Sequence, residues 1–360
     1  MKKSRKLLSI SFFVLLFYSF LPQTCFAKVQ NKTSAGFTVP TICKPAEESD
    51  HHLLIAKVKA LFQADKFDEL EKMAQKLRSS KEHGPSGVWI LTRYYDCLAA
   101  DYDGQDSSFN WAELFAKLKL WTVQKPASVT PRIAYAKALR NYAWKARGNG
   151  WADTVSPASW KEFEKRLNMA HKVITEAWAT RSNDPELAAT LLGIYLGEEE
   201  NKLAYNKLFN QAIAAEPTFY SYYFLKAKYL QPRWHGTEGE WQGFTKEAAD
   251  KLGGESGDIL YARTVWNLYN VLNTNMFKQP YVDKDRVVRG FKALEKEYPD
   301  SVWVLSVECF ADFEVGATAA AFNSMQKLKN RVDLGIWKNL DCFKQAKDKL
   351  EQLKKSNQLL

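Results

Sequence analysis

The feature that most constrains this chain is the spacing of its apolar residues. From about residue 51 onward they recur at the period of one face of an α-helix, as in Phe67, Leu70, Ala74 and Leu77. The alternation of apolar and polar residues that marks a strand between hairpin turns is almost missing. The pattern therefore predicts an all-α chain made of short helices.

These helices come in pairs, which indicates an internal repeat. The clearest pair spans residues 185–217, with a Leu-Gly step at 192–193 on its first helix and Phe209 and Ala212 on its second. This order resembles a tetratricopeptide unit of about 34 residues. One pair has too little apolar surface to fold alone, so it buries its open face against the next pair. We expect residues 51–360 to form an irregular tetratricopeptide-like α-solenoid of about six or seven helix pairs.

Residues 1–27 have the pattern of a secretory signal peptide. Basic residues at 2–6 precede an apolar run from Leu7 to Leu21, and small residues follow before a cut after Ala27. The run is shorter than the roughly 20 residues that span a bilayer, and an uncleaved N-terminal anchor is the alternative. No later stretch is long and apolar enough to cross a membrane. We expect an exported protein, periplasmic or secreted, with no transmembrane span in its mature chain.

Removal of this leader changes both the order and the charge expected of the chain. Residues 28–50 are polar, contain two prolines and show no helical period, so we expect a loosely ordered lead-in. The leader carries four basic and no acidic residues, and its loss lowers the formal charge from +10 to +6. Nucleic-acid binders concentrate their basic residues on one stripe, whereas here they alternate with acidic ones. We therefore expect a solvated, slightly basic surface and no nucleic-acid partner.

Four cysteines remain after the leader, in a compartment where disulfides persist. Cys309 and Cys342 lie near each other in sequence and on neighbouring predicted helices, which favours a bond between them. Cys43 and Cys97 would then tie the lead-in to the first helices. Isolated buried thiols are the alternative, and the spacing alone does not choose between the two.

Three segments in the middle of the chain resemble an uncharacterised family of bacterial proteins with tetratricopeptide-like helices. They are residues 147–155, residues 222–236 and residues 257–263, and the resemblance covers about residues 134–266. Members of that family tend to read Pro-Arg-Trp-Gly-Gly where this chain has His235 in place of the first glycine. The resemblance implies a helical-repeat fold. It implies no activity, since none is established for the family.

The same segments contain the candidate binding residues. Arg147 and Trp151 lie in one glycine-rich loop, and Arg233, Trp234 and His235 lie in another. A planar cation beside an indole ring is typical of binding hot spots. The alternative is a structural turn in which tryptophan packing and an arginine on carbonyl oxygens hold the end of a helix.

Motifs for catalysis are missing from the sequence. It has no Cys/His spacing for a closed zinc site, no phosphate-binding glycine loop and no Gly-x-Ser-x-Gly elbow. We therefore expect no enzyme activity, no metal and no cofactor. The favoured function is a scaffold in the cell envelope that binds a protein or peptide. The alternative is an enzyme or small-ligand binder whose pocket forms where the loops 147–151 and 232–240 meet.

Overall fold

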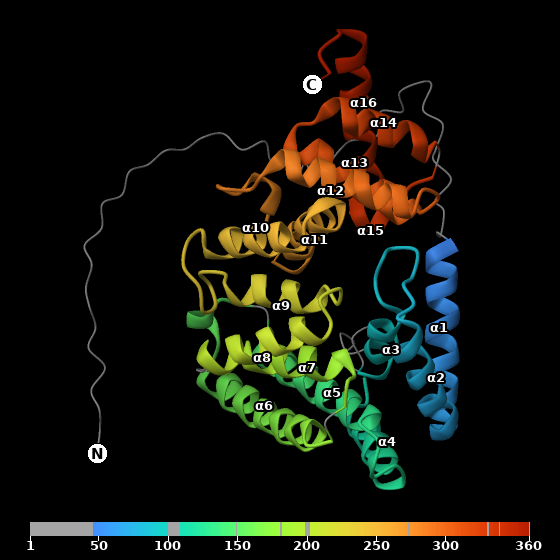
Figure 1. The fold of residues 1–360 in the computed structure, drawn as a ribbon, viewed down its shortest axis with the longest axis vertical. Coiled ribbons are helices and arrows are strands. Elements are labelled where there is room, and N and C mark those ends of the chain that lie inside the picture. Colours follow the sequence, from blue (N-terminus) through green and yellow to red (C-terminus); the bar gives the residue numbers. More distant parts are fainter. Residues whose placement is uncertain are drawn as a thin grey trace, which may run out of the picture. The chain divides into compact units, whose positions relative to one another are not determined.

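The chain folds into helices stacked along one array (Figure 1). It is described here by a computed structural model. The described residues are 46–99, 109–148, 150–180, 182–198, 202–272, 274–329, 331–337 and 339–359. The predicted signal peptide, most of the predicted lead-in and Cys43 lie outside these ranges. Helix α1 begins at Ala46, inside the segment expected to be a lead-in.

Helices account for nearly all regular structure in the described ranges. No strand forms in these ranges, where strand-type pairing is limited to isolated bridges such as that between His83 and Trp89, so the prediction of an all-α fold is confirmed. The α-helices are α1 (Ala46–Gln63), α2 (Phe67–Ser80), α3 (Ile90–Leu98), α4 (Trp111–Gln124), α5 (Thr130–Arg147), α6 (Pro157–Trp178), α7 (Pro185–Tyr195), α8 (Lys202–Ala215), α9 (Ser221–Tyr229), α10 (Glu240–Leu252), α11 (Gly254–Leu272), α12 (Lys284–Glu297), α13 (Val302–Val315), α14 (Thr318–Leu328), α15 (Leu334–Trp337) and α16 (Leu340–Lys355). Two short 3-10 helices are η1 (Ala152–Thr154) and η2 (Met276–Lys278).

Alternate helices stack on one another, which is the packing of a helical-repeat array. Helix α1 contacts α3, and the series continues through α5, α7, α9 and α11. The even-numbered helices pack against their odd-numbered neighbours, as α6 does on α5 and α12 on α11. Beyond α11 the array continues through η2 to α13. The odd-numbered helices from α1 to α11 thus form one continuous series of contacts, called below the odd-numbered layer.

Local sequence signals explain where individual helices begin and end. At the start of α13 the Ser301 side chain accepts a hydrogen bond from the backbone N–H of Val304. The same helix ends at Gly316, whose φ of 90° is a left-handed conformation that glycine adopts without a steric penalty. Pro185 opens α7, after Asp184 has capped it by accepting a bond from the N–H of Glu186.

No helix in the described ranges has both the length and the apolarity needed to cross a bilayer.

Buried charges fix how three helices of the odd-numbered layer stack. The ammonium of Lys137 on α5 lies 2.5 Å from an Asp96 oxygen on α3 and 3.2 Å from a Glu186 oxygen on α7. All three side chains are buried. Burial raises the pKa of Glu186, and the Lys137 charge opposes that rise. Because a buried charge without its partner is costly, the three residues hold α3, α5 and α7 in one register.

A second buried contact joins α2 and α3 to the start of α7. One carboxylate oxygen of Asp184 accepts a hydrogen bond from Arg78 at 2.7 Å and another from the Tyr95 hydroxyl at 2.6 Å. Arg78 also donates to the Thr130 hydroxyl on α5 at 3.2 Å. The side chain that caps α7 is therefore also bonded to α2 and α3, and through Arg78 it is connected to α5.

The predicted bond between Cys309 and Cys342 is wrong. The Cys309 thiol is fully buried on α13 and donates to the Ala321 carbonyl on α14 at 3.4 Å. Cys342 lies in the first turn of α16, and both sulfurs are thiols. Cys97 is also a buried thiol, and burial raises its pKa to about 12. Nearness in sequence did not reveal that the Cys309 thiol is bonded to a carbonyl of α14.

Two buried carboxyl groups one turn apart on α13 lack part of their hydrogen bonding. Both oxygens of Asp312 and one of Glu308 have no partner among the described residues. Burial raises the pKa of Asp312 to about 8 and that of Glu308 to about 7, and each is raised further by nearby acidic groups. The ammonium of Lys292 opposes both shifts. Both groups are therefore held in their neutral form at mildly acidic pH.

This pair predicts that the protein loses stability as the pH rises. An unfolded aspartate loses its proton at roughly pH 4, whereas folded Asp312 keeps its proton until about pH 8. The folded state therefore holds more protons across that window, and stability falls by up to about 1.4 kcal/mol per pH unit for each such carboxyl. Thermal unfolding followed from about pH 5 to about pH 9 should show this fall, and Asp312→Asn should reduce the slope of stability against pH.

The matched control is Asp348→Asn, which neutralises an exposed carboxylate on α16. It should leave the slope of stability against pH unchanged. If Asp312→Asn and the wild type lost stability in parallel over the same pH range, Asp312 would not be the group responsible.

Candidate binding sites

The two loops selected from the sequence meet in the structure. Arg147 ends α5, Trp151 precedes η1, and Arg233 and Trp234 follow α9. The Arg233 guanidinium carbon lies 4.8 Å from the centre of the Trp151 ring, and that of Arg147 lies 5.5 Å from the Trp234 ring. Residues more than eighty positions apart thus form one group, as the alternative of a pocket between these loops requires.

Arg147 is the buried centre of this group. Its guanidinium faces the rings of Trp144 at 5.6 Å and Trp160 at 5.0 Å. It donates hydrogen bonds to the carbonyl oxygens of Gly148 at 3.2 Å and Gly150 at 3.1 Å. Burial lowers the pKa of Arg147, and the nearby charge of Arg233 lowers it further. These contacts give Arg147 the structural role at a helix end that the sequence also allowed.

A lysine that the sequence analysis did not select completes the group. The Lys228 ammonium on α9 lies 5.9 Å from the rings of both Trp144 and Trp234. Burial lowers its pKa to about 8, and the cations Arg140 and Arg233 add to that shift. We call the following seven residues the tryptophan–cation cluster: Trp144, Arg147, Trp151, Trp160, Lys228, Arg233 and Trp234.

His235 lies beside this cluster with contacts of its own. Its ring stacks on Tyr229, with the ring centres 4.4 Å apart, and its Nε2 hydrogen is donated to the Leu196 carbonyl at 3.0 Å. A side chain on the next residue, Gly236, would come within 2.0 Å of the Leu230 carbonyl oxygen. His235 and Gly236 therefore hold the turn that presents Arg233 and Trp234.

A large cavity lies elsewhere, between the first helices and the last ones. Its volume is about 1210 Å³, and none of the tryptophan–cation cluster lines it. Apolar side chains from both ends of the array line it: Leu54, Leu61, Met73, Leu77, Val88, Ile90, Phe224, Trp266, Trp303 and Ile336. The cavity thus unites residues separated by more than two hundred positions in the sequence.

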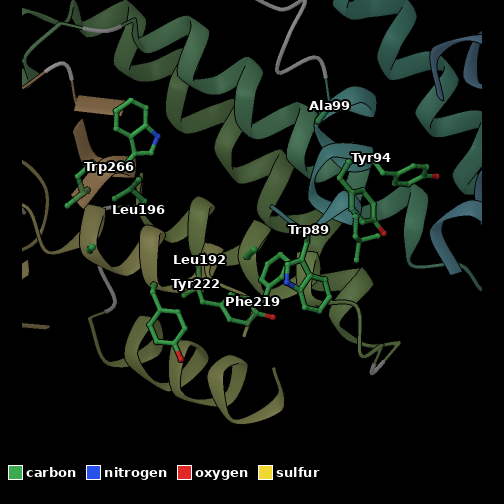
Figure 2. Packing of buried hydrophobic residues seen from close by; sticks show 14 of the residues in the cluster. Trp89, Tyr94, Ala99, Leu192, Leu196, Phe219, Tyr222 and Trp266 are labelled. Carbon is green, nitrogen blue, oxygen red and sulfur yellow. The ribbon is translucent and has the colours of Figure 1, made fainter. Parts of the chain in front are cut away.

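The connection between α2 and α3, residues 81–89, forms one wall of this cavity. Arg263 on α11 donates a hydrogen bond from Nη1 to the Gly87 carbonyl at 2.6 Å. Gly87 has a φ of 68°, and a Cβ there would come within 2.8 Å of the same Arg263 nitrogen. Trp89 packs edge-on against Phe219 with ring centres 5.2 Å apart, as Figure 2 shows. The loop is therefore fixed across the array by a hydrogen bond and by ring packing.

Arg263 is buried, with no ion pair to an acidic side chain among the described residues. Its guanidinium faces the rings of Tyr220 at 5.5 Å and Phe224 at 6.0 Å. Burial lowers the pKa of Arg263 to about 10, so it remains a cation at neutral pH. The loop carbonyl and the two ring faces stabilise this charge, and the charge of nearby Glu297 adds to them.

Polar side chains of the cavity come mainly from α2 and α11. Asn267 and Asn270 lie one turn apart on α11, half-buried and exposed respectively. The basic lining residues are Lys57, Lys72, Lys76, Arg93 and Arg263, and the acidic ones are Glu69, Glu82 and Asp333. The cavity therefore offers apolar contacts, amide groups and a small excess of positive charge.

Sequence reasoning did not select this cavity, because its walls come from distant parts of the chain. The one local signal is the pair of asparagines at 267 and 270, which interrupts the apolar helix α11. Among the described residues, no group of three or more His, Cys, Asp or Glu side chains could hold a metal ion.

Fold and cavity together define an all-α array of stacked helices with a cavity between its ends. Residues 54–198 match a family described as a domain of unknown function (DUF4034). The resemblance to an uncharacterised family is confirmed, although the match covers a different span from the expected 134–266. It includes the loop of Arg147 and ends before that of Arg233. No curated protein and no solved structure matches the chain.

The Arg263 contact predicts that one substitution will release the cavity wall. Arg263→Met keeps an unbranched apolar stem but removes the donor to the Gly87 carbonyl. Leaving a buried carbonyl unpaired costs about 1–3 kcal/mol, so amide hydrogen exchange in residues 81–89 should accelerate roughly tenfold or more. Exchange measured by mass spectrometry on the folded protein tests this.

Arg289→Met on α12 is the control, since the Arg289 side chain is 56% exposed. In this variant the amides of residues 81–89 should exchange at the wild-type rate. An unchanged rate in Arg263→Met as well would mean that the ring packing of Trp89 holds the loop without the hydrogen bond.

Proposed function

We propose that this protein is an exported helical-repeat scaffold that binds an extended segment of a partner protein in the cavity between its first and last helices. The observation that carries the proposal is the size of that cavity, about 1210 Å³. Sites for small molecules are usually about 300–1,000 Å³. A larger, open-ended lining suits a stretch of polypeptide, which can lie along several helices at once.

The chemistry of the lining supports a peptide as the occupant. A side-chain amide both donates and accepts hydrogen bonds, so Asn267 and Asn270 match the N–H and C=O groups of an extended backbone. Ring and aliphatic faces such as Trp266 and Met73 offer contacts for apolar side chains. Five basic lining residues against three acidic ones favour a segment that also carries carboxylates.

Binding without a catalytic step is the role proposed, and the cell envelope is its proposed place. The cell envelope is proposed because residues 1–27 have the pattern of a signal peptide, which would direct the chain out of the cytoplasm. A partner in the envelope would then meet the cavity after export.

The peptide proposal is tested by selecting ligands from a phage-displayed library of random peptides on the purified protein. A synthetic peptide with the enriched sequence should bind the wild type measurably. The double variant Asn267→Ala with Asn270→Ala should bind it roughly tenfold more weakly, because two hydrogen bonds of about 0.5–1.5 kcal/mol each are lost. Isothermal titration calorimetry measures both affinities.

Asn323→Ala is the matched control, since Asn323 is an exposed amide on α14 outside the cavity lining. It should bind the peptide like the wild type. Selection that enriches no sequence, or enriched peptides that bind the double variant as well as the wild type, would count against the cavity as a peptide site.

Export is tested separately with residues 1–27 alone. Fused to a phosphatase reporter that is active only after its disulfides form, they should give activity in a bacterial host. Replacing Leu15 and Leu16 by arginine interrupts the apolar run and should abolish that activity. An active reporter in the arginine variant, or none with the native residues, would contradict export by this leader.

A further inference from the structure

The tryptophan–cation cluster concentrates positive charge around a single indole. The cationic groups of Arg147, Lys228 and Arg233 lie 5.5, 5.9 and 5.6 Å from the Trp234 ring centre. The neighbouring charges that act on Arg147 and Lys228 are themselves cations, namely Arg233 on both and Arg140 on Lys228. Among the described residues, no carboxylate forms an ion pair with any of these three cations.

Two buried N–H groups in the cluster have no acceptor. The Nε of Arg147 and the Nε1 of Trp234 lack a hydrogen-bond partner among the described residues. Arg147 is only 7% exposed, so water does not readily satisfy it. Ring faces offset part of the positive charge, but they do not accept these two hydrogen bonds as an oxygen would. The cluster thus lacks a group that is anionic and rich in acceptor oxygens.

Beside these donors lies a flat apolar surface. Trp151 is 65% exposed, which is unusual for a large aromatic side chain, and the Arg233 guanidinium covers one face of its ring at 4.8 Å. An exposed indole held in place by a cation is available for stacking with a planar group of a ligand. The surface and the unsatisfied donors are linked through Arg233, which contacts both Trp151 and Trp234.

We propose that the tryptophan–cation cluster binds a phosphate monoester whose organic part carries a flat ring that stacks on Trp151. A phosphate monoester carries nearly two negative charges at neutral pH and three strong acceptor oxygens. It would therefore offset more of the charge on the three cations than a carboxylate could. Arg233 and Lys228, which are both half-buried, would donate to its oxygens, and the buried charge of Arg147 would add to the attraction. This site is distinct from the cavity assigned to the partner segment.

The test compares two phosphate monoesters that differ in their organic group, which is a methyl group in one and a flat phenyl ring in the other. Methyl phosphate and phenyl phosphate are titrated into the full-length protein at neutral pH and low, matched ionic strength by calorimetry. The wild type should bind both, and phenyl phosphate more tightly. Arg233→Gln should weaken methyl phosphate roughly tenfold or more. Trp151→Ala should remove the advantage of phenyl phosphate and leave methyl phosphate binding unchanged.

Lys119→Gln is the charge-matched control, because Lys119 is exposed on α4 and outside the cluster. It should bind both phosphates like the wild type, as should the double variant Asn267→Ala with Asn270→Ala. The inference is overturned if the wild type binds neither phosphate, or if Arg233→Gln binds methyl phosphate with wild-type affinity. Equal affinity for the two phosphates in the wild type would overturn the stacking on Trp151.

Discussion

The arrangement of this protein depends on a contact between residues 176 positions apart, in which Arg263 donates to the carbonyl of Gly87. A guanidinium buried without a carboxylate needs a strong acceptor and polarisable neighbours, and the loop carbonyl with two aromatic faces supplies them. Gly87 is required because its backbone is left-handed and its missing side chain leaves room for Arg263. This contact holds residues 81–89, which form one wall of the cavity, against α11.

Polar groups inside the array have a comparable role earlier in the chain. Apolar burial is non-directional, whereas a buried charge that is separated from its partner is costly. Lys137 between Asp96 and Glu186, and Asp184 beneath Arg78, therefore select one stacking of the early helices. Asp312 on α13 lacks such full pairing, and its raised pKa makes the stability of the folded state fall as the pH rises toward about 8.

The sequence predicted the helices well because their signals are local. Phe67, Leu70, Ala74 and Leu77 are all buried on one face of α2, as their spacing indicates. The Leu-Gly step at 192–193 does mark a repeat helix, but a Cβ on this glycine would come within 2.6 Å of the Arg140 side chain. The position thus makes room for a cation from α5. Local periodicity could not show which distant side chain needed that space.

The candidate sites divide in the same way. Arg147, Trp151, Arg233 and Trp234 stood out because arginine and tryptophan are adjacent or close in each loop, and the structure brings the two loops together. Lys228 had no such signal, since only the stacking of α9 near α5 places it beside Trp144. The cavity was not foreseen at all, because no short segment contains more than part of its wall. The wrong prediction of a bond between Cys309 and Cys342 has the same cause, because proximity along the chain carries no information on which way a thiol points.

The contact between α11 and the loop after α2 also limits how such a protein can evolve. Open solenoids lengthen readily by tandem duplication, since a new unit needs only the two faces on either side of it. Here an extra helix pair inserted between residues 90 and 254 would carry Arg263 away from Gly87, leaving one charge and one carbonyl stranded. Descendants of this architecture should therefore vary in their loops and beyond α11 while keeping a constant number of units between the two contact points.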